Sequence, residues 1–129
     1  MSIVQMYHIM KQRLATIMPK ERITRLRGMA WLQSGLFHSR SVHLTRIASK
    51  LPGRAKKLSQ VRQLERLLAN RHIRVREWYH PVAAGLLRHA AAAGRPLRLI
   101  IDGSKVGHGH QLLMVALGYR RRALPLAWT

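Results

Sequence analysis

The feature that most constrains the fold is a change in apolar spacing at Gly94–Pro96. Before this point apolar residues recur every three or four positions, which is typical of amphipathic helices. After it they form short, nearly continuous runs, which are typical of strands. The chain has 129 residues, the usual length of one domain. We therefore expect a helical part over 1–96 and a partial sheet over 97–129.

Five helices are predicted in the first part from apolar stripes and from the residues that stop them. They cover about Ile3–Ile17, Ile23–Phe37, Leu44–Leu51, Lys56–Ala69 and Arg74–Ala93. Pro19 should close the first helix, Gly35 should lie at the frayed end of the second, and Ser41 should cap the third. Pro81 predicts either a kink or a fresh start in the fifth. Together these helices predict an all-helical bundle.

Three strands are predicted in the second part, so the fold class is α+β. Leu97–Asp102 is expected to enter a turn at Gly103, and Gln111–Tyr119 is expected to be buried on both faces. The third strand is Arg122–Trp128, and its Pro125 cannot donate to a ladder, which places it on a sheet edge. The expected sheet is an antiparallel meander whose first strand keeps an uncovered edge.

The charge balance restricts the chemistry of the chain. There are 24 Lys and Arg residues against 4 Asp and Glu residues, which gives a net charge of +20. A mechanism that needs several carboxylates is close to excluded, and the absence of cysteine excludes a disulfide scaffold, a cysteine zinc site and a thiol nucleophile. With 47% hydrophobic residues, however, the chain is not a disordered basic tail.

A basic cluster surrounds the start of the fourth predicted helix. Its members are Arg54, Lys56, Lys57, Arg62 and Arg66. A helix-turn-helix arrangement of the third and fourth helices would offer these cations and a helix N-terminus to the phosphates of double-stranded DNA. The alternative is a solvated basic face without a defined ligand.

Asp102 follows an apolar strand and precedes Gly103–Ser104, where a central strand can present a carboxylate to a cleft. It could equally begin an ordinary turn. His108 and His110 follow closely, and two histidines with one aspartate form a known metal-ligand set. Exposed polar residues in a glycine-rich turn would explain the same pattern, so both alternatives stay open.

Three aromatic residues have the chemistry to stack on nucleic-acid bases, namely Trp78, Tyr79 and Trp128. Their spacing along a helix and a strand more often indicates core residues. We expect them in the core and keep base stacking as the alternative.

The sequence around Asp102 resembles the opening of the catalytic domain of bacterial insertion-sequence transposases of the DDE type. The matching stretches are Leu99–Gly107, Leu112–Leu117 and Arg122–Trp128. Val61–Leu68 and Trp78–Pro81 are similar to the amino-terminal region of the same family. The resemblance covers roughly residues 41–129, and the strand block is its more specific part.

The resemblance implies a helical DNA-binding domain over 1–96, followed by the first three strands of a ribonuclease H-like sheet over 97–129. It also implies transposon-end DNA as the partner, and Asp102 as the first catalytic carboxylate and Mg²⁺ ligand of a complete enzyme. The family needs a further Asp and a Glu, yet no acidic residue follows Asp102. One carboxylate cannot hold the two metal ions, so we expect no stably bound Mg²⁺ and no strand cleavage by this chain alone, and whether it is an enzyme stays open.

Two other functions fit the composition. One is a basic DNA-binding or architectural protein whose strands are structural, and the other is a ribosome-associated RNA-binding protein. We expect neither a signal peptide nor a membrane anchor, and a cytoplasmic, nucleoid-associated location in a bacterium. Self-association through the uncovered strand edge is also expected.

Overall fold

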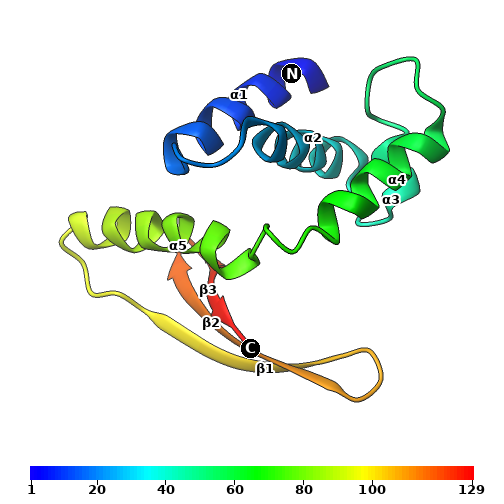
Figure 1. The fold of residues 1–129 in the computed structure, drawn as a ribbon. Helices are drawn as coiled ribbons and strands as arrows, with labels where there is room; N and C mark the ends of the chain where they lie inside the picture. The colour runs from blue at the N-terminus through cyan, green and yellow to red at the C-terminus, as the bar shows by residue number, and fades with distance from the viewer. The chain divides into compact units, whose positions relative to one another are not determined.

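Five helices and one three-stranded antiparallel sheet make up the computed structural model, which describes residues 1–129 (Figure 1). The mixed α+β class is therefore confirmed. The elements are α1 (Ile3–Ile17), α2 (Ile23–Ser39), α3 (Leu44–Ala48), α4 (Lys57–Leu68), α5 (Val75–Ala92), β1 (Leu99–Val106), β2 (His110–Tyr119) and β3 (Arg122–Trp128). None of the five helices combines the length and the apolar character that crossing a membrane requires.

The chain divides into two compact units, which we call unit 1 (Met1–Ile73) and unit 2 (Arg74–Thr129). Unit 1 contains α1 to α4, and unit 2 contains α5 and the sheet. This division falls before α5, whereas the change in apolar spacing lies after it, near residue 96. Helix α5 joins the strands because it packs against β3.

Helix α1 begins with a capping box. The Ser2 Oγ accepts a hydrogen bond from the Gln5 N–H at 3.2 Å, and the Gln5 side chain accepts one from the Ser2 N–H at 2.9 Å. The helix then packs on α2, where the Tyr7 and Trp31 rings stack with centroids 3.9 Å apart. Its predicted extent and its end before Pro19 are confirmed.

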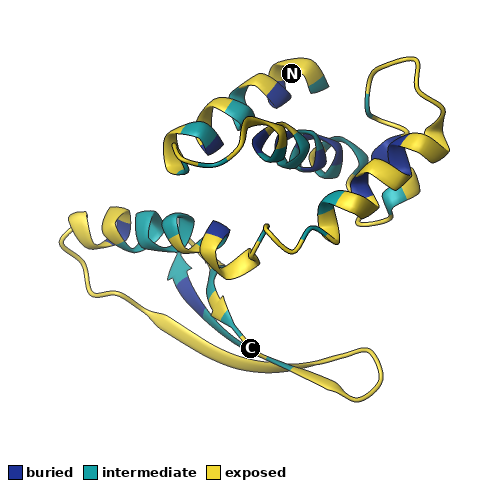
Figure 2. Cartoon of the chain, in the orientation of Figure 1, coloured by how far each residue is buried: buried dark blue, intermediate teal, exposed yellow.

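The remaining core of unit 1 joins α2, α3 and α4 (Figure 2). Its buried members are Leu32, Ile47, Ala48, Val61 and Leu64. Each helix contributes one apolar side to this cluster, and burial of such sides provides most of the stability of short helices like α3. The helix predicted over Lys56–Ala69 is confirmed as α4.

Two predicted helix boundaries are wrong. Gly35 does not lie at a frayed end: it is buried inside α2, where a Cβ atom would lie 2.6 Å from the Ile47 Cγ2. The glycine therefore lets α3 approach α2 closely. Ser41 is not the N-cap of α3, because His43 holds that position and the Ser41 Oγ accepts a hydrogen bond from its N–H at 3.1 Å.

The sheet has the predicted meander order β1-β2-β3, with Pro125 on an outer strand. The first strand runs further than expected, because Gly103 is paired with Leu113 in the ladder and does not form a turn. The turn lies instead at Gly107 and Gly109, which have φ values of 60° and 81°. Only glycine adopts such values readily, so these two residues set the position of the hairpin.

The sheet is less buried than the sequence suggested. All 8 residues of β1 are exposed, and in β2 only Ala116 and Leu117 are buried, so the expectation of two buried faces is wrong (Figure 2). The reason is that β1 lies at an edge, with no element of the chain hydrogen-bonded to its outer side. Leu99, Ile101 and Val106 are consequently exposed apolar residues.

Helix α5 is continuous through Pro81, so of the two predicted alternatives the fresh start does not occur there. Its buried members include Trp78 and Ala90, which confirms the predicted core position of Trp78. The Tyr79 hydroxyl donates a hydrogen bond to the Pro125 carbonyl oxygen of β3. This hydrogen bond joins α5 to β3, although the two residues are 46 positions apart in the sequence.

We predict that Gly35→Val lowers the free energy of unfolding by about 1–3 kcal/mol, because the new side chain overpacks the contact between α2 and α3. The matched control is Gly85→Ala in α5, where a Cβ atom would meet nothing within 4 Å. That control should raise stability by about 0.5–1 kcal/mol, since alanine is the better helix former. Urea unfolding followed by circular dichroism measures both, and equal effects would contradict the close approach.

We also predict that the full chain self-associates through β1 as its concentration rises, because an exposed apolar edge pairs readily with another strand. Ile101→Lys should weaken this association, since Ile101 is 69% exposed and a charge there opposes strand pairing. Val42→Lys, at a residue 81% exposed in unit 1, is the charge-matched control. Sedimentation equilibrium gives the result, and a monomer at every concentration would contradict the prediction.

Candidate nucleic-acid interface

Helix α4 separates its apolar and basic residues onto different sides. Gln60, Val61 and Leu64 are buried, and Arg62 and Arg66 are exposed. Because residues four apart lie on the same helical face, the two arginines are neighbours on the outward side of α4. The predicted spacing of these two cations is therefore present on an exposed helical surface.

The other three members of the basic cluster lie where the chain enters α4. Arg54 is in the connection between α3 and α4, Lys56 is the N-cap residue, and Lys57 is the first helical residue. All three are exposed. The five cations are thus all exposed, and they lie close together in the sequence between Arg54 and Arg66.

None of these five cations forms an ion pair. The two salt bridges of the chain join Arg25 to Glu21 at 2.9 Å and Arg74 to Glu77 at 3.2 Å. Glu65 lies on α4 but makes no salt bridge. The positive charge of the basic cluster is therefore uncompensated within the chain and available to an anion.

The start of α4 adds a second source of positive potential. It has no side-chain cap and no acidic residue in its first turn. The first N–H groups of a helix lack partners within the helix, and the helix dipole places partial positive charge there. Beside Lys56 and Lys57, these groups favour binding of an oxygen anion such as a phosphate.

The connection before α4 is anchored by a residue that the sequence did not point out. The buried Gln60 side chain donates a hydrogen bond to the Pro52 carbonyl oxygen at 3.3 Å. A glutamine on an amphipathic helix is usually a solvated residue. Its burial depends on the neighbouring loop, so no local pattern could have revealed it.

Asp102 lies inside β1, opposite Met114, so the prediction that it ends the strand is wrong. His108 is in the turn and His110 begins β2, opposite Val106. No group of three or more histidine, cysteine or acidic residues is close enough to hold a metal ion. The donors near this single exposed carboxylate therefore do not fit a two-metal centre.

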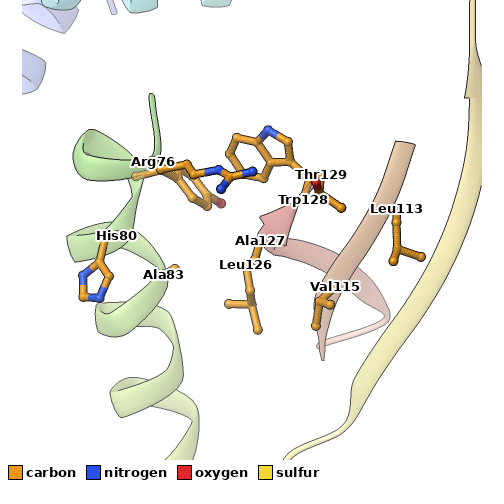
Figure 3. Close-up of a pocket in the computed structure, with 10 residues that line it drawn as sticks. Arg76, His80, Ala83, Leu113, Val115, Leu126, Ala127, Trp128 and Thr129 are labelled. Carbon is orange, nitrogen blue, oxygen red and sulfur yellow. The ribbon is translucent and has the colours of Figure 1, made fainter. Parts of the chain in front are cut away.

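A pocket with a volume of about 440 Å³ lies within unit 2, between α5 and the strands β2 and β3 (Figure 3). Two aromatic side chains form part of its wall, and the Tyr79 and Trp128 rings meet edge to face with centroids 5.0 Å apart. Burial raises the pKa of the Tyr79 phenol above its ordinary value. Sequence reasoning missed this pocket because its two aromatic residues lie far apart in the chain.

Comparisons of the chain with protein-family models, with curated proteins and with solved structures found no match.

We predict that Tyr79→Phe destabilises the fold by about 0.5–1.5 kcal/mol at neutral pH, because the Pro125 carbonyl loses its donor. Because the pKa of Tyr79 is raised, there is a pH range in which the folded state still holds the Tyr79 proton and the unfolded state has released it. The contribution of Tyr79 is thus complete below about pH 10 and is lost as the pH rises further. Urea unfolding of both proteins from about pH 9 to 11 should show their difference shrinking, and a constant difference would contradict the pKa shift.

Proposed function

We propose that unit 1 binds double-stranded DNA through the basic cluster. The observation that carries this proposal is a run of five exposed cations on α4 and its preceding connection, none of which has an acidic partner. Phosphate neutralisation by lysine and arginine supplies most of the affinity of non-specific DNA binding. A chain with a net charge of +20 is well suited to such a partner.

Helix α4 is the element that would lie in the major groove, whose width admits an α-helix. Arg62 and Arg66 project from its outward side, where they would meet base edges or phosphates. Arg54, Lys56 and the uncapped start of α4 would contact the adjacent phosphate backbone. Phosphate contacts fix the position of the helix on the DNA, whereas only contacts with base edges give sequence preference.

The finer proposal is that this chain is the amino-terminal portion of a DDE-type transposase and that its DNA target is a transposon end. Support comes from the resemblance of the sequence and from the order of elements, in which helices precede an antiparallel meander with Asp102 in its first strand. Asp102 would be the first metal ligand of a complete enzyme. Alone, this chain is proposed to bind DNA without cutting it.

We predict that Arg62→Gln and Arg66→Gln each weaken duplex binding, whereas Arg13→Gln, an exposed charge-matched control on α1, changes it little. An arginine that contacts a base should cost about 1–3 kcal/mol on the preferred site and much less on random DNA. An arginine that contacts a phosphate should weaken both equally and reduce the salt slope by about 1. Fluorescence anisotropy over a series of salt concentrations distinguishes these two outcomes.

The proposal fails if wild-type binding is insensitive to salt, because binding through six to ten phosphates should lose roughly 10³–10⁵ in affinity between about 50 and 200 mM salt. It also fails if Arg13→Gln weakens binding as much as the two α4 variants do. In that case the charge of the whole chain, and not the basic cluster, would determine the affinity.

A further inference from the structure

The pocket of unit 2 combines aromatic walls with positive charge. Arg76 and His80 lie on its α5 side, Trp128 lies on its β3 side, and Leu113 and Val115 line it from β2 (Figure 3). Its volume of about 440 Å³ is in the range of small-molecule sites. Such a site suits a flat aromatic ring that carries a negative group.

The two aromatic rings have a geometry suited to one planar guest. The Tyr79 and Trp128 rings are inclined at 61° with centroids 5.0 Å apart, so they contact each other edge to face. This contact holds the Trp128 ring in place, and an aromatic guest would stack on the part of its face that Tyr79 does not cover. The Tyr79 hydroxyl already donates a hydrogen bond to the Pro125 carbonyl oxygen, which holds the Tyr79 ring in place. The ring can therefore interact with a guest mainly through aromatic contact.

The charge of the pocket is not neutralised within unit 2. Glu77, the only acidic residue of α5, pairs with Arg74 at 3.2 Å, and Arg76 makes no salt bridge. Arg76 is an exposed lining residue of the pocket, so its guanidinium is free to meet an anion there. An aromatic ring joined to a phosphate is the chemistry of a nucleotide.

We propose that this pocket binds the base of an unpaired DNA nucleotide, with Trp128 as the stacking surface and Arg76 facing the adjacent phosphate. The inference rests on the proposed function, since both take DNA as the partner, but it uses unit 2 and a different form of DNA. A base inside a duplex cannot enter a pocket without leaving its stack, so single-stranded DNA is the preferred ligand. Because every base has an aromatic face, the site should tolerate different sequences.

The test compares the binding of a labelled oligothymidine of about 10 nucleotides with that of a blunt duplex, using the full chain and fluorescence anisotropy. Trp128→Ala should weaken oligothymidine binding by roughly 5- to 150-fold, since stacking on one aromatic side chain is worth about 1–3 kcal/mol and 1.4 kcal/mol is tenfold. Trp128→Phe should keep most of the affinity because it keeps a ring. Duplex binding should be unchanged in both variants.

Further variants keep the test decisive if Trp128→Ala fails to fold by circular dichroism. Ala83→Phe fills the pocket without removing either wall, and it should also weaken oligothymidine binding. Arg76→Gln should weaken it more than Arg88→Gln does, which removes the same charge from an exposed position on α5 outside the pocket.

The outcomes separate this inference from the proposed function. If duplex binding is intact and oligothymidine binding is the same in Trp128→Ala, Ala83→Phe and Arg76→Gln as in the wild type, the pocket assignment alone is overturned. Loss of duplex binding in the wild type, with oligothymidine binding still dependent on Trp128, would overturn the proposed function and support the pocket. If Arg76→Gln and Arg88→Gln lower the oligothymidine affinity equally, Arg76 contributes only general positive charge and its assigned role is overturned.

Discussion

The shortage of acidic residues governs how this chain is held together. With 24 basic residues against 4 acidic ones, most cations cannot find a partner inside the protein, and only two salt bridges form. Like charges that remain unpaired repel one another and destabilise the compact state. The fold must therefore rely on apolar packing and on a few polar anchors, such as Gln60 and Tyr79. A bound polyanion would relieve the repulsion and stabilise the folded state.

Apolar packing and charge are separated most clearly on α4, and this part of the molecule could be predicted from the sequence. Val61 and Leu64 face the core, whereas Arg62 and Arg66 are exposed, because a helical period of 3.6 residues fixes both sides at once. Gly35 could not be interpreted in the same way. Its role is to admit Ile47 from another helix, and the sequence of α2 does not show at which position a neighbouring helix approaches it.

In unit 2 the sequence predicted the order of the strands, and for β1 it misjudged the length. Gly103 looked like a turn, but the pair Gly107 and Gly109 makes the turn, and only their backbone angles distinguish these roles. Asp102, which was predicted at the end of the strand, therefore lies in its interior. The aromatic pocket lay beyond prediction altogether, because Tyr79 meets Pro125 and Trp128 only after the sheet has formed.

The same long-range contacts decide which segments should stay together in a shortened chain. A fragment that stops near residue 95 keeps α5 but removes β3, so the Tyr79 hydroxyl loses the Pro125 carbonyl and the ring loses Trp128. The apolar side of α5 would then have no sheet to cover it, and exposed apolar surface favours aggregation. A chain divided between Ile73 and Arg74 keeps the contacts within unit 1 and the contacts between α5 and the sheet in unit 2. Unit 1 ending at Ile73 would retain α4 with the whole basic cluster, so we expect the DNA binding proposed for that cluster to require neither α5 nor the sheet.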